Sequence, residues 1–355
     1  MHFSTPLLAL IPALSFSLAA PTLPAEELYL PDGLPNPNAD QLLDIERRAH
    51  GTLPGLRLPA TISTAGVANL QLMTFTAFQD VAFFSELVRN VTQNVTGYAL
   101  PDDAERNYTL RSLEPILAQR EIHALAANGA LQHFGKNFIQ PCRYQFPVST
   151  LRQAIEFAAT SASFHIGHLQ DMTERFAANG DLDLIRLAAA MIGNEGQQEG
   201  WFRVFLDKYP TSTPLPTTSD VHLAFTAAQT FVVPSSCPNI HEIDLKTFMS
   251  LEIVTTPEPK THKIQVSWTH AKIEPKEEEV LWLAYVNQLN VPAVVPLKVV
   301  SCDGQKSTAV ALWPYEEYTL NGLTLAAVVN RRGPFASATA VAHSTVYGPG
   351  LIVVE

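Results

Sequence analysis

Charged and polar side chains stand at core positions on apolar helical segments of this sequence. In "ILAQREIHALAANGALQHFG", residues 116–135, apolar residues recur at helical spacing, and Arg120 and His123 fall on the same stripe. His165 holds such a position in a later segment, and Glu195 in the one after it. Because a buried charge is costly unless it is paired, these side chains need partners inside the protein.

These residues lie near the middle of their segments, so the sequence predicts that they meet in one layer. Proteins that bind two metals between four helices place one Glu on each of two helices and Glu-x-x-His on the other two. This sequence instead has Arg120-x-x-His123 and Glu195-x-x-Gln198, and an arginine in the layer repels a dication. The candidates for the layer are Gln79, Asp80, Arg120, His123, His165, Glu195, Gln198 and Glu199.

Two uses of this layer remain open. In the first, Arg120 forms a buried ion pair with Glu195, and Gln79, Gln198 and the histidines complete a polar network that fixes helix register. We expect this arrangement, which needs no cofactor. In the second, iron or manganese binds to the imidazoles and carboxylates, because both ligand types suit such metals. The metal ligands would then be His123, His165, Glu195 and Glu199, with Asp80 as the alternative to Glu199.

Four long amphipathic segments are expected to position the layer. Each has one apolar stripe at helical spacing, and four such helices of similar length predict an antiparallel four-helix bundle. On the third of them, His165 and His168 share one helical face and offer a pair of imidazoles. The segments cover about 63–92, 106–138, 149–178 and 181–208.

The chain changes character after the fourth segment. It first becomes rich in Thr, Pro and Ser, and from residue 246 onward short runs with β-branched residues are separated by Gly, Pro and Asn. This pattern is typical of a β-sandwich. The predicted fold class is α+β, mainly α, with a four-helix bundle followed by a C-terminal β-sandwich-like domain. The predicted divisions are a signal peptide at 1–19, an extended N-terminal arm at 20–62, the bundle at 63–210, a linker packing on the bundle at 211–245 and a β-rich domain at 246–355.

The N-terminus and the sequons predict secretion. An apolar stretch from Pro6 to Leu18 precedes small residues, which is a secretory signal pattern. No stretch is apolar for long enough to span a membrane. Three Asn-x-Thr sequons, at Asn90, Asn94 and Asn107, predict a glycosylated surface loop. We therefore expect a secreted protein, extracellular or associated with the cell wall.

Cysteine count and charge narrow the chemistry further. With three cysteines in an oxidising compartment, we expect a disulfide between Cys142 and Cys237, which leaves Cys302 without an assigned state. The formal net charge of −11 argues against nucleic acid and anionic membranes as partners. No nucleophile elbow, phosphate loop, dinucleotide fingerprint or zincin motif is present, so the sequence favours no enzyme class.

The chain resembles the secreted fungal ferritin-like proteins of the late sexual development and stress-response family. The resemblance covers about 65–240 and implies a ferritin-like bundle in a secreted or cell-wall protein, with no established reaction. It rests on "LAQREIHALAANGALQHFG", "YQFPVSTLRQAIEFAAT", "IGHLQDM", "AANGDLDLIRLAAAMIGNEGQQEGWFR" and "FVVPSSCPN".

The family pattern also bears on the layer. It has Glu more usually at position 120 and a ferritin-type His at position 198, where this chain has Arg120 and Gln198. His123 and Glu195 match the pattern, and His165 is atypical and could replace a lost ligand. The resemblance therefore implies a degenerate metal site.

Three functions remain in competition. The first is a non-catalytic secreted protein of fungal development, the cell wall or stress tolerance. The second is a metal-dependent oxidoreductase or metal store. The third is an adhesion module for cell-wall glycans or proteins, with Trp268, Trp282 and Trp313 of the β-rich domain as candidate contacts.

Overall fold

The computed structural model describes residues 32–55, 57–270 and 280–355, and shows an α+β protein. The predicted signal peptide at 1–19 lies outside the described residues. Of the predicted arm, the described part contains helix α1, Ala39–Ala49, which begins at a capping box formed by Asn38 and Gln41.

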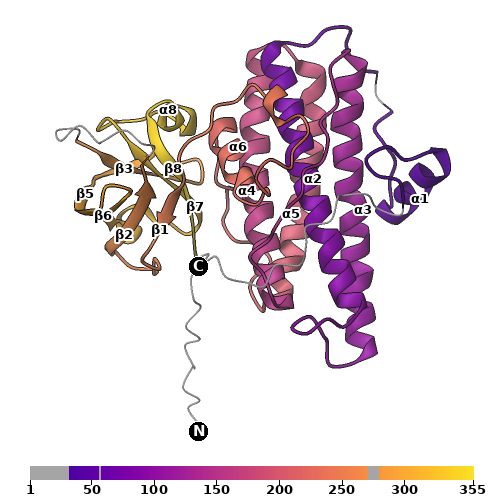
Figure 1. Cartoon of the computed structure of the whole chain (residues 1–355), viewed down its shortest axis with the longest axis horizontal. Coiled ribbons are helices and arrows are strands. Elements are labelled where there is room, and N and C mark those ends of the chain that lie inside the picture. Colours follow the sequence, from indigo (N-terminus) through magenta and orange to yellow (C-terminus); the bar gives the residue numbers. More distant parts are fainter. Residues whose placement is uncertain (1–31, 56, 271–279) are drawn as a thin grey trace.

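Four long helices form one body beside the sheets (Figure 1). Ser63, Asp102 and Thr150 cap three of them with side-chain oxygens that accept from backbone N–H groups. The second long helix was expected to run to about residue 138 but ends five residues earlier, because Gly135 adopts a left-handed conformation (φ 65°) that terminates it. The helices are α2 Thr64–Thr92, α3 Asp103–His133, α4 Leu151–Ala178 and α5 Ile185–Phe205, the last preceded by the 3-10 turn η1 Leu182–Leu184.

The long helices pack through apolar stripes that leave one polar layer between them. Helix α2 packs against both α3 and α4, and α4 packs against α5. On one side of the layer, Phe83, Phe84 and Phe202 belong to an aromatic-rich cluster. On the other side, Leu70 and Met172 belong to a second cluster. The polar layer is thus bounded by apolar packing at both ends.

None of the described helices is long and apolar enough to cross a membrane.

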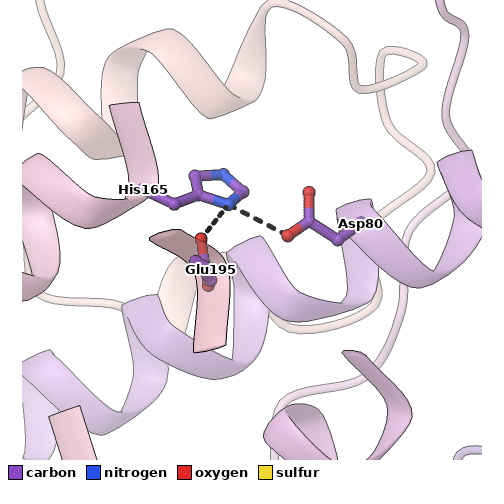
Figure 2. A group of neighbouring side chains, drawn as sticks. All are labelled: Asp80, His165 and Glu195. Carbon is purple, nitrogen blue, oxygen red and sulfur yellow. Dashed lines mark ion pairs between the residues drawn. The ribbon is translucent and has the colours of Figure 1, made fainter. Parts of the chain in front are cut away.

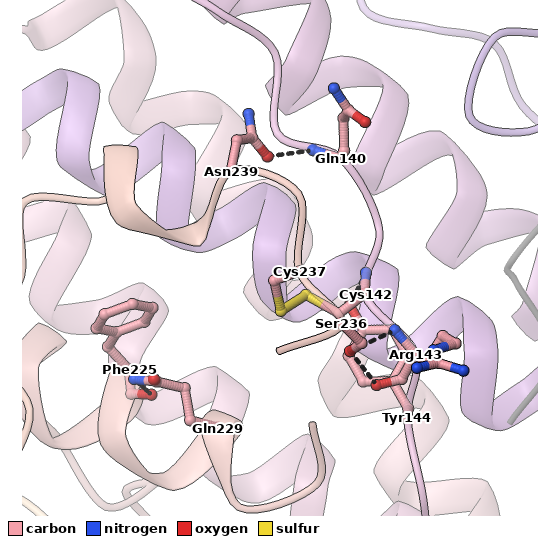
Figure 3. Close-up of a disulfide and its surroundings, with 9 residues drawn as sticks. All are labelled: Gln140, Cys142, Arg143, Tyr144, Phe225, Gln229, Ser236, Cys237 and Asn239. Carbon is pink, nitrogen blue, oxygen red and sulfur yellow. Dashed lines mark hydrogen bonds between the residues drawn. A yellow bond between two sulfur atoms is a disulfide. The ribbon is translucent and has the colours of Figure 1, made fainter. Parts of the chain in front are cut away.

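The segment after α5 packs back onto the helices. It contains α6, Val221–Gln229, and the 3-10 turn η2, Ile240–Glu242. The predicted disulfide between Cys142 and Cys237 is confirmed and ties this segment to the α3–α4 loop (Figure 3). The backbone N–H of Gln140 donates to Asn239 Oδ1 at 3.1 Å beside it.

Two antiparallel sheets share the second core of the molecule. One has the strand order β1-β2-β6-β5 and the other β4-β3-β7-β8. Trp268, Tyr285 and Trp313 are buried between them. The strands are β1 Leu251–Ile253, β2 His262–Thr269, β3 Trp282–Asn287, β4 Ala293–Pro296, β5 Lys298–Cys302, β6 Lys306–Trp313, β7 Gly322–Val329 and β8 Thr345–Val354, with the short helices α7 Tyr315–Tyr318 and α8 Ala338–Ala342.

Strand β7 joins the two halves of the protein. Every residue of it is buried, because one face meets the other sheet through Ala326 and Val328, while Leu325 and Ala327 belong to the cluster shared with the helices. This explains why its sequence is mostly apolar, with Thr324 as its polar residue, rather than alternating. Thr217 Oγ1 donates to Leu323 O at 2.6 Å at the same junction.

The three sequons do not form one surface loop. Asn90 is buried within α2, and its amide hydrogen-bonds to Glu86 and Tyr98, so its expected surface position is wrong. Asn94 is exposed in the turn after α2, and Asn107 is exposed on α3. The difference arises because α2 continues to Thr92 and carries the first sequon on its packed face.

Candidate functional site

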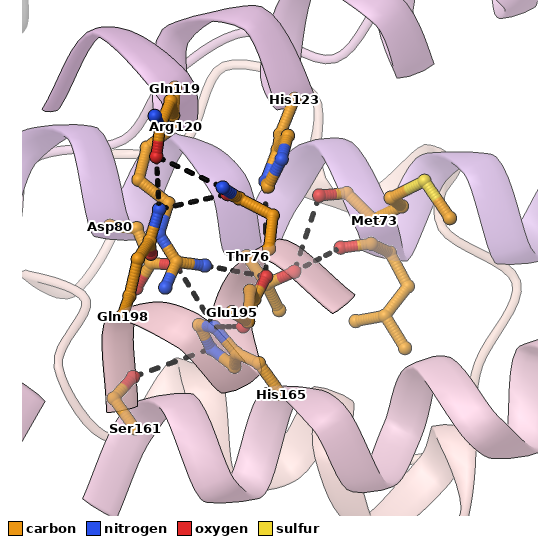
Figure 4. A network of polar contacts seen from close by, with 12 residues as sticks. Met73, Thr76, Asp80, Gln119, Arg120, His123, Ser161, His165, Glu195 and Gln198 are labelled. Carbon is orange, nitrogen blue, oxygen red and sulfur yellow. Dashed lines mark hydrogen bonds and ion pairs between the residues drawn. The ribbon is translucent and has the colours of Figure 1, made fainter. Parts of the chain in front are cut away.

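Four charged side chains, one from each long helix, meet in the polar layer (Figure 4). Arg120 Nη1 of α3 lies 3.0 Å from Asp80 Oδ2 of α2 and 2.5 Å from Glu195 Oε1 of α5. His165 Nδ1 of α4 lies 2.9 Å from the same Asp80 oxygen and 3.7 Å from Glu195 Oε2 (Figure 2). The ion pair predicted between Arg120 and Glu195 is therefore present, and Asp80 and His165 complete it.

The charged side chains of the layer are almost fully buried. The side chain of Arg120 is 2% exposed, and those of Asp80, His165 and Glu195 are 6% exposed or less. The guanidinium also lies over the ring of Phe84, 5.8 Å from its centroid. Such burial is tolerable only because each charge has an opposite charge in contact.

The layer brings two basic groups against two carboxyl groups. Burial opposes the charge of Asp80, but His165 and Arg120 hold the pKa of this carboxyl below its usual range. Burial also opposes the charge of His165, but Asp80 and Glu195 raise the pKa of this imidazole. Burial raises the pKa of Glu195 against the attraction of Arg120 and His165. With Glu195 ionised, two cations face two anions.

Two further histidines stay neutral beside this network. Burial and the charge of Arg120 lower the pKa of His123 to about 3. Burial and the charge of His165 lower the pKa of His168 well below its usual value. His123 Nδ1 stands 3.9 Å from Glu195 Oε1, and His168 Nδ1 has no hydrogen-bond partner among the described residues. These imidazoles contribute polarity without charge.

A cavity of about 10 Å³ lies within the layer, which is the space of about one water molecule. Its walls combine the charged network with the two neutral histidines and with sulfur and methyl groups. The lining residues are Met73, Thr76, Ala77, Asp80, Arg120, His123, His165, His168, Leu169, Met191 and Glu195.

Two of the predicted layer residues lie outside the ionic contacts. Gln79 is buried, and its Oε1 has no hydrogen-bond partner among the described residues. It precedes Asp80 around α2 by the usual helical step of about 100°. Gln198 Nε2 donates to Gln119 Oε1 at 2.7 Å and to Asn194 Oδ1 at 2.8 Å. That Gln79 and Gln198 aid the pair of Arg120 and Glu195 stays a prediction.

Glu199 lies apart from the three residues whose ligand atoms approach one another, so the structure does not bring this predicted metal ligand into the layer. Glu199 lies one turn beyond Glu195 on α5, about 6 Å further along the helix axis. Its Oε1 accepts from Ser163 Oγ at 2.7 Å and from Ser212 Oγ at 3.5 Å. It therefore belongs to the junction between α4 and the segment after α5.

The amide chain between α3 and α5 is the part of the site that sequence reasoning missed. Gln119 accepts from Asn194 as well as from Gln198, so three amides bridge the two helices; Gln119 and Gln198 are labelled in Figure 4. Gln119 also donates to Ala49 O of α1 at 3.3 Å. The spacing Asn194-x-x-x-Gln198, which places both amides on one helical face, was the available signal.

Three residues of the layer could hold a metal ion, and Arg120 contacts two of them. Asp80, His165 and Glu195 each offer a ligand atom, and these atoms lie within 4.8 Å of one another. Both carboxylates, however, already contact the guanidinium, so a metal bound to them would stand beside a fixed positive charge. The arginine thus holds a positive charge against the same carboxylates that a metal would use.

The described tryptophans of the sheets offer little to a glycan. Trp268 and Trp313 are buried in the core between the sheets, and only Trp282 is partly exposed, with Arg332 over its ring.

No protein-family model matches the sequence, and no curated protein is significantly similar to it.

Proposed function

We propose that this protein is a secreted, non-catalytic ferritin-like protein of fungal development, the cell wall or stress response, with a metal site that has become an ion-pair site. The observation that carries the proposal is the contact of Arg120 Nη1 with both Asp80 and Glu195. The four long helices serve as a ferritin-like bundle, and the sheets serve as a β-sandwich-like cover. The layer holds the helices in register through matched charges.

Two further features support this proposal. The disulfide between Cys142 and Cys237 suits an oxidising compartment. The neutral state of His123 and His168 is compatible with a layer that needs no further cation, because both imidazoles are buried without a carboxylate of their own. Cell-wall components are the partners that this proposal favours.

The substitution Arg120→Glu tests the proposal directly. It creates the Glu-x-x-His pattern with His123 and adds a third carboxylate to the layer. We expect the parent protein, purified natively, to contain less than about 0.1 equivalents of iron or manganese, and the variant to bind Mn²⁺ at near one equivalent. Elemental analysis and calorimetric titration with Mn²⁺ measure both quantities.

The control is Arg111→Glu, which makes the same charge change on the exposed side of α3. It should bind no more metal than the parent. Near-stoichiometric metal in the native parent, lost in His165→Ala, would overturn the proposal and support a metal store or oxidoreductase instead. That alternative rests on the proximity of Asp80, His165 and Glu195.

A further inference from the structure

A second charged cluster joins the N-terminal part of the described chain to α3. We call residues 32–49, which include α1, the clasp. Arg48 of the clasp contacts Asp32 through Nη2, lies 3.0 Å from Asp44 Oδ2 through Nε, and reaches Glu121 Oε2 of α3 at 3.3 Å. Glu121 is fully buried, whereas Arg48 keeps 31% of its side chain exposed.

This cluster contains more negative charge than positive charge. One guanidinium serves three carboxylates, and two of their oxygens, Asp32 Oδ1 and Glu121 Oε1, are buried with no hydrogen-bond donor among the described residues. A buried carboxylate oxygen without a donor is costly. A proton on Glu121 would remove one negative charge and supply the missing donor.

The clasp also covers the polar layer on the side formed by α2 and α3. Leu34 is 1% exposed and packs into the groove between α2 and α3, against Phe78, Val81 and Ala124. Ala77 belongs both to this groove and to the lining of the cavity. Figure 1 shows α1 against the side of α3 that faces away from the sheets.

A second attachment lies at the end of α1. Ala49 O accepts from Gln119, and Gln119 accepts from the amides of α5. The clasp thus closes the groove between α2 and α3 with Leu34 and is tied by Gln119 to the amide chain between α3 and α5. Removing it would uncover α3 on both sides of Arg120.

We propose that the clasp is a proton-dependent lid, held down by protonated Glu121 and released from α3 when this carboxyl ionises, so that water reaches the ionic layer. The inference rests on the contacts of the clasp and does not depend on the proposed function. The charged and titratable groups of this lid are Asp32, Asp44 and Arg48 on the clasp and Glu121 on α3.

The direction of the pH dependence follows from Glu121. Burial and the neighbouring charge of Asp32 raise the pKa of Glu121 to about 8, although Arg48 opposes the change. A raised carboxyl pKa means that the docked clasp binds its proton more tightly than the released clasp does. Docking is therefore fully supported below the ordinary pKa of 4.5 and weakens as the pH rises to about 8.

Hydrogen exchange followed by mass spectrometry tests this lid on the full chain. Exchange in the peptide 39–49 is compared at pH 5 and pH 9 after correction for the intrinsic chemical rate. We expect its protection to fall at least about tenfold at pH 9. Glu121 loses its proton between the two pH values, and each pH unit over which docked and released clasp differ by one bound proton changes the docking equilibrium about tenfold. A peptide that contains residues 74–81 should lose protection in step.

Three variants separate the lid from a general effect of pH. Glu121→Gln keeps the shape of the side chain and carries a permanent donor, so its clasp should stay protected at both pH values. Asp32→Asn should reduce the loss of protection, because it removes the charge that disfavours ionised Glu121. The control Glu114→Gln, an exposed carboxylate on the same helix, should behave like the parent.

Equal protection of the parent clasp at pH 5 and pH 9 would overturn the proposal. So would a pH response that persists unchanged in both Glu121→Gln and Asp32→Asn. If Glu121→Gln releases the clasp at both pH values, Asp32→Asn decides the matter, and an unreduced response there rejects the switch. Release of the clasp without any change in residues 74–81 would reject its role as a cover of the layer.

Discussion

Arg120 and Glu121 are neighbours on α3, yet they belong to two buried clusters of opposite character. The ionic layer around Arg120 pairs two cations with two carboxylates. The cluster around Glu121 gives three carboxylates a single guanidinium, that of Arg48. Charge balance, rather than burial alone, distinguishes the cluster that joins the four helices from the cluster that we propose responds to pH.

The two clusters also differ in what surrounds them. The layer lies between four long helices and has apolar clusters at both ends. The clasp cluster joins one short helix to one long helix at the edge of the molecule, and part of Arg48 is exposed. Loss of the layer should therefore weaken the whole helical body, and loss of the clasp should remain local.

The largest expected effect is that of Arg120→Ala. It leaves Asp80 and Glu195 without the cation that both contact, so we expect the free energy of unfolding to fall by about 3–5 kcal/mol. Urea unfolding followed by circular dichroism measures this. The exposed Arg111→Ala should change it by less than about 0.5 kcal/mol.

A compensated variant sharpens the same test. Replacing Arg120 by Met together with Asp80→Asn and Glu195→Gln removes the charges on both sides, and neutral replacements of buried ionic groups are often tolerated. We expect this triple variant to regain most of the stability lost in Arg120→Ala. A triple variant no more stable than the single one would show that charge compensation is not what the layer provides.

The second effect is on acid stability. Because the pKa of His123 is lowered to about 3, the unfolded chain binds a proton at this residue below its ordinary value of 6.5 while the folded chain does not. Stability should thus fall as the pH drops from about 6.5 toward 3. His123→Asn should reduce this slope by up to about 1.4 kcal/mol for each pH unit.

Unfolding midpoints at pH 6.5, 5.5 and 4.5 measure this slope. The control His241→Asn replaces an exposed histidine and should leave the slope unchanged. If the His123→Asn variant keeps the slope of the parent, burial does not hold the imidazole of His123 neutral in the parent protein. The distinction between a neutral His123 and a charged His165 would then be wrong.

The smallest effect is expected for Arg48→Ala. The variant removes the guanidinium that contacts Asp32, Asp44 and Glu121, but the partly exposed position of Arg48 limits the loss to about 1 kcal/mol of global stability. Peptide 39–49 should nevertheless lose hydrogen-exchange protection at pH 5. A global loss as large as that of Arg120→Ala would contradict the distinction between the two clusters.

The layer could be predicted from sequence because its members break an apolar pattern. Arg120, His165 and Glu195 occupy positions that helical spacing assigns to the core, and a buried charge demands a partner. The disulfide followed from the cysteine count together with the positions of Cys142 and Cys237 in the segments that follow the helices. The α+β class followed from the change of period near residue 246.

The failures have an equally local cause. Periodicity fixes a face of a helix but leaves depth along the axis uncertain, so Glu199 was placed in a layer that lies a full turn away. It also gives no information on which distant segment covers a helix. The contact of Arg48 with Glu121 spans 73 residues, and no pattern in either segment indicates it.

The disulfide between Cys142 and Cys237 has a consequence for a cut chain. It closes a covalent ring across a sequence separation of 95 that contains α4, α5 and α6. A protease that cleaves one bond anywhere inside this ring leaves both fragments joined, and only a reductant separates them. The histidine and the glutamate that α4 and α5 bring to the layer therefore remain tethered to the rest of the molecule after a single nick.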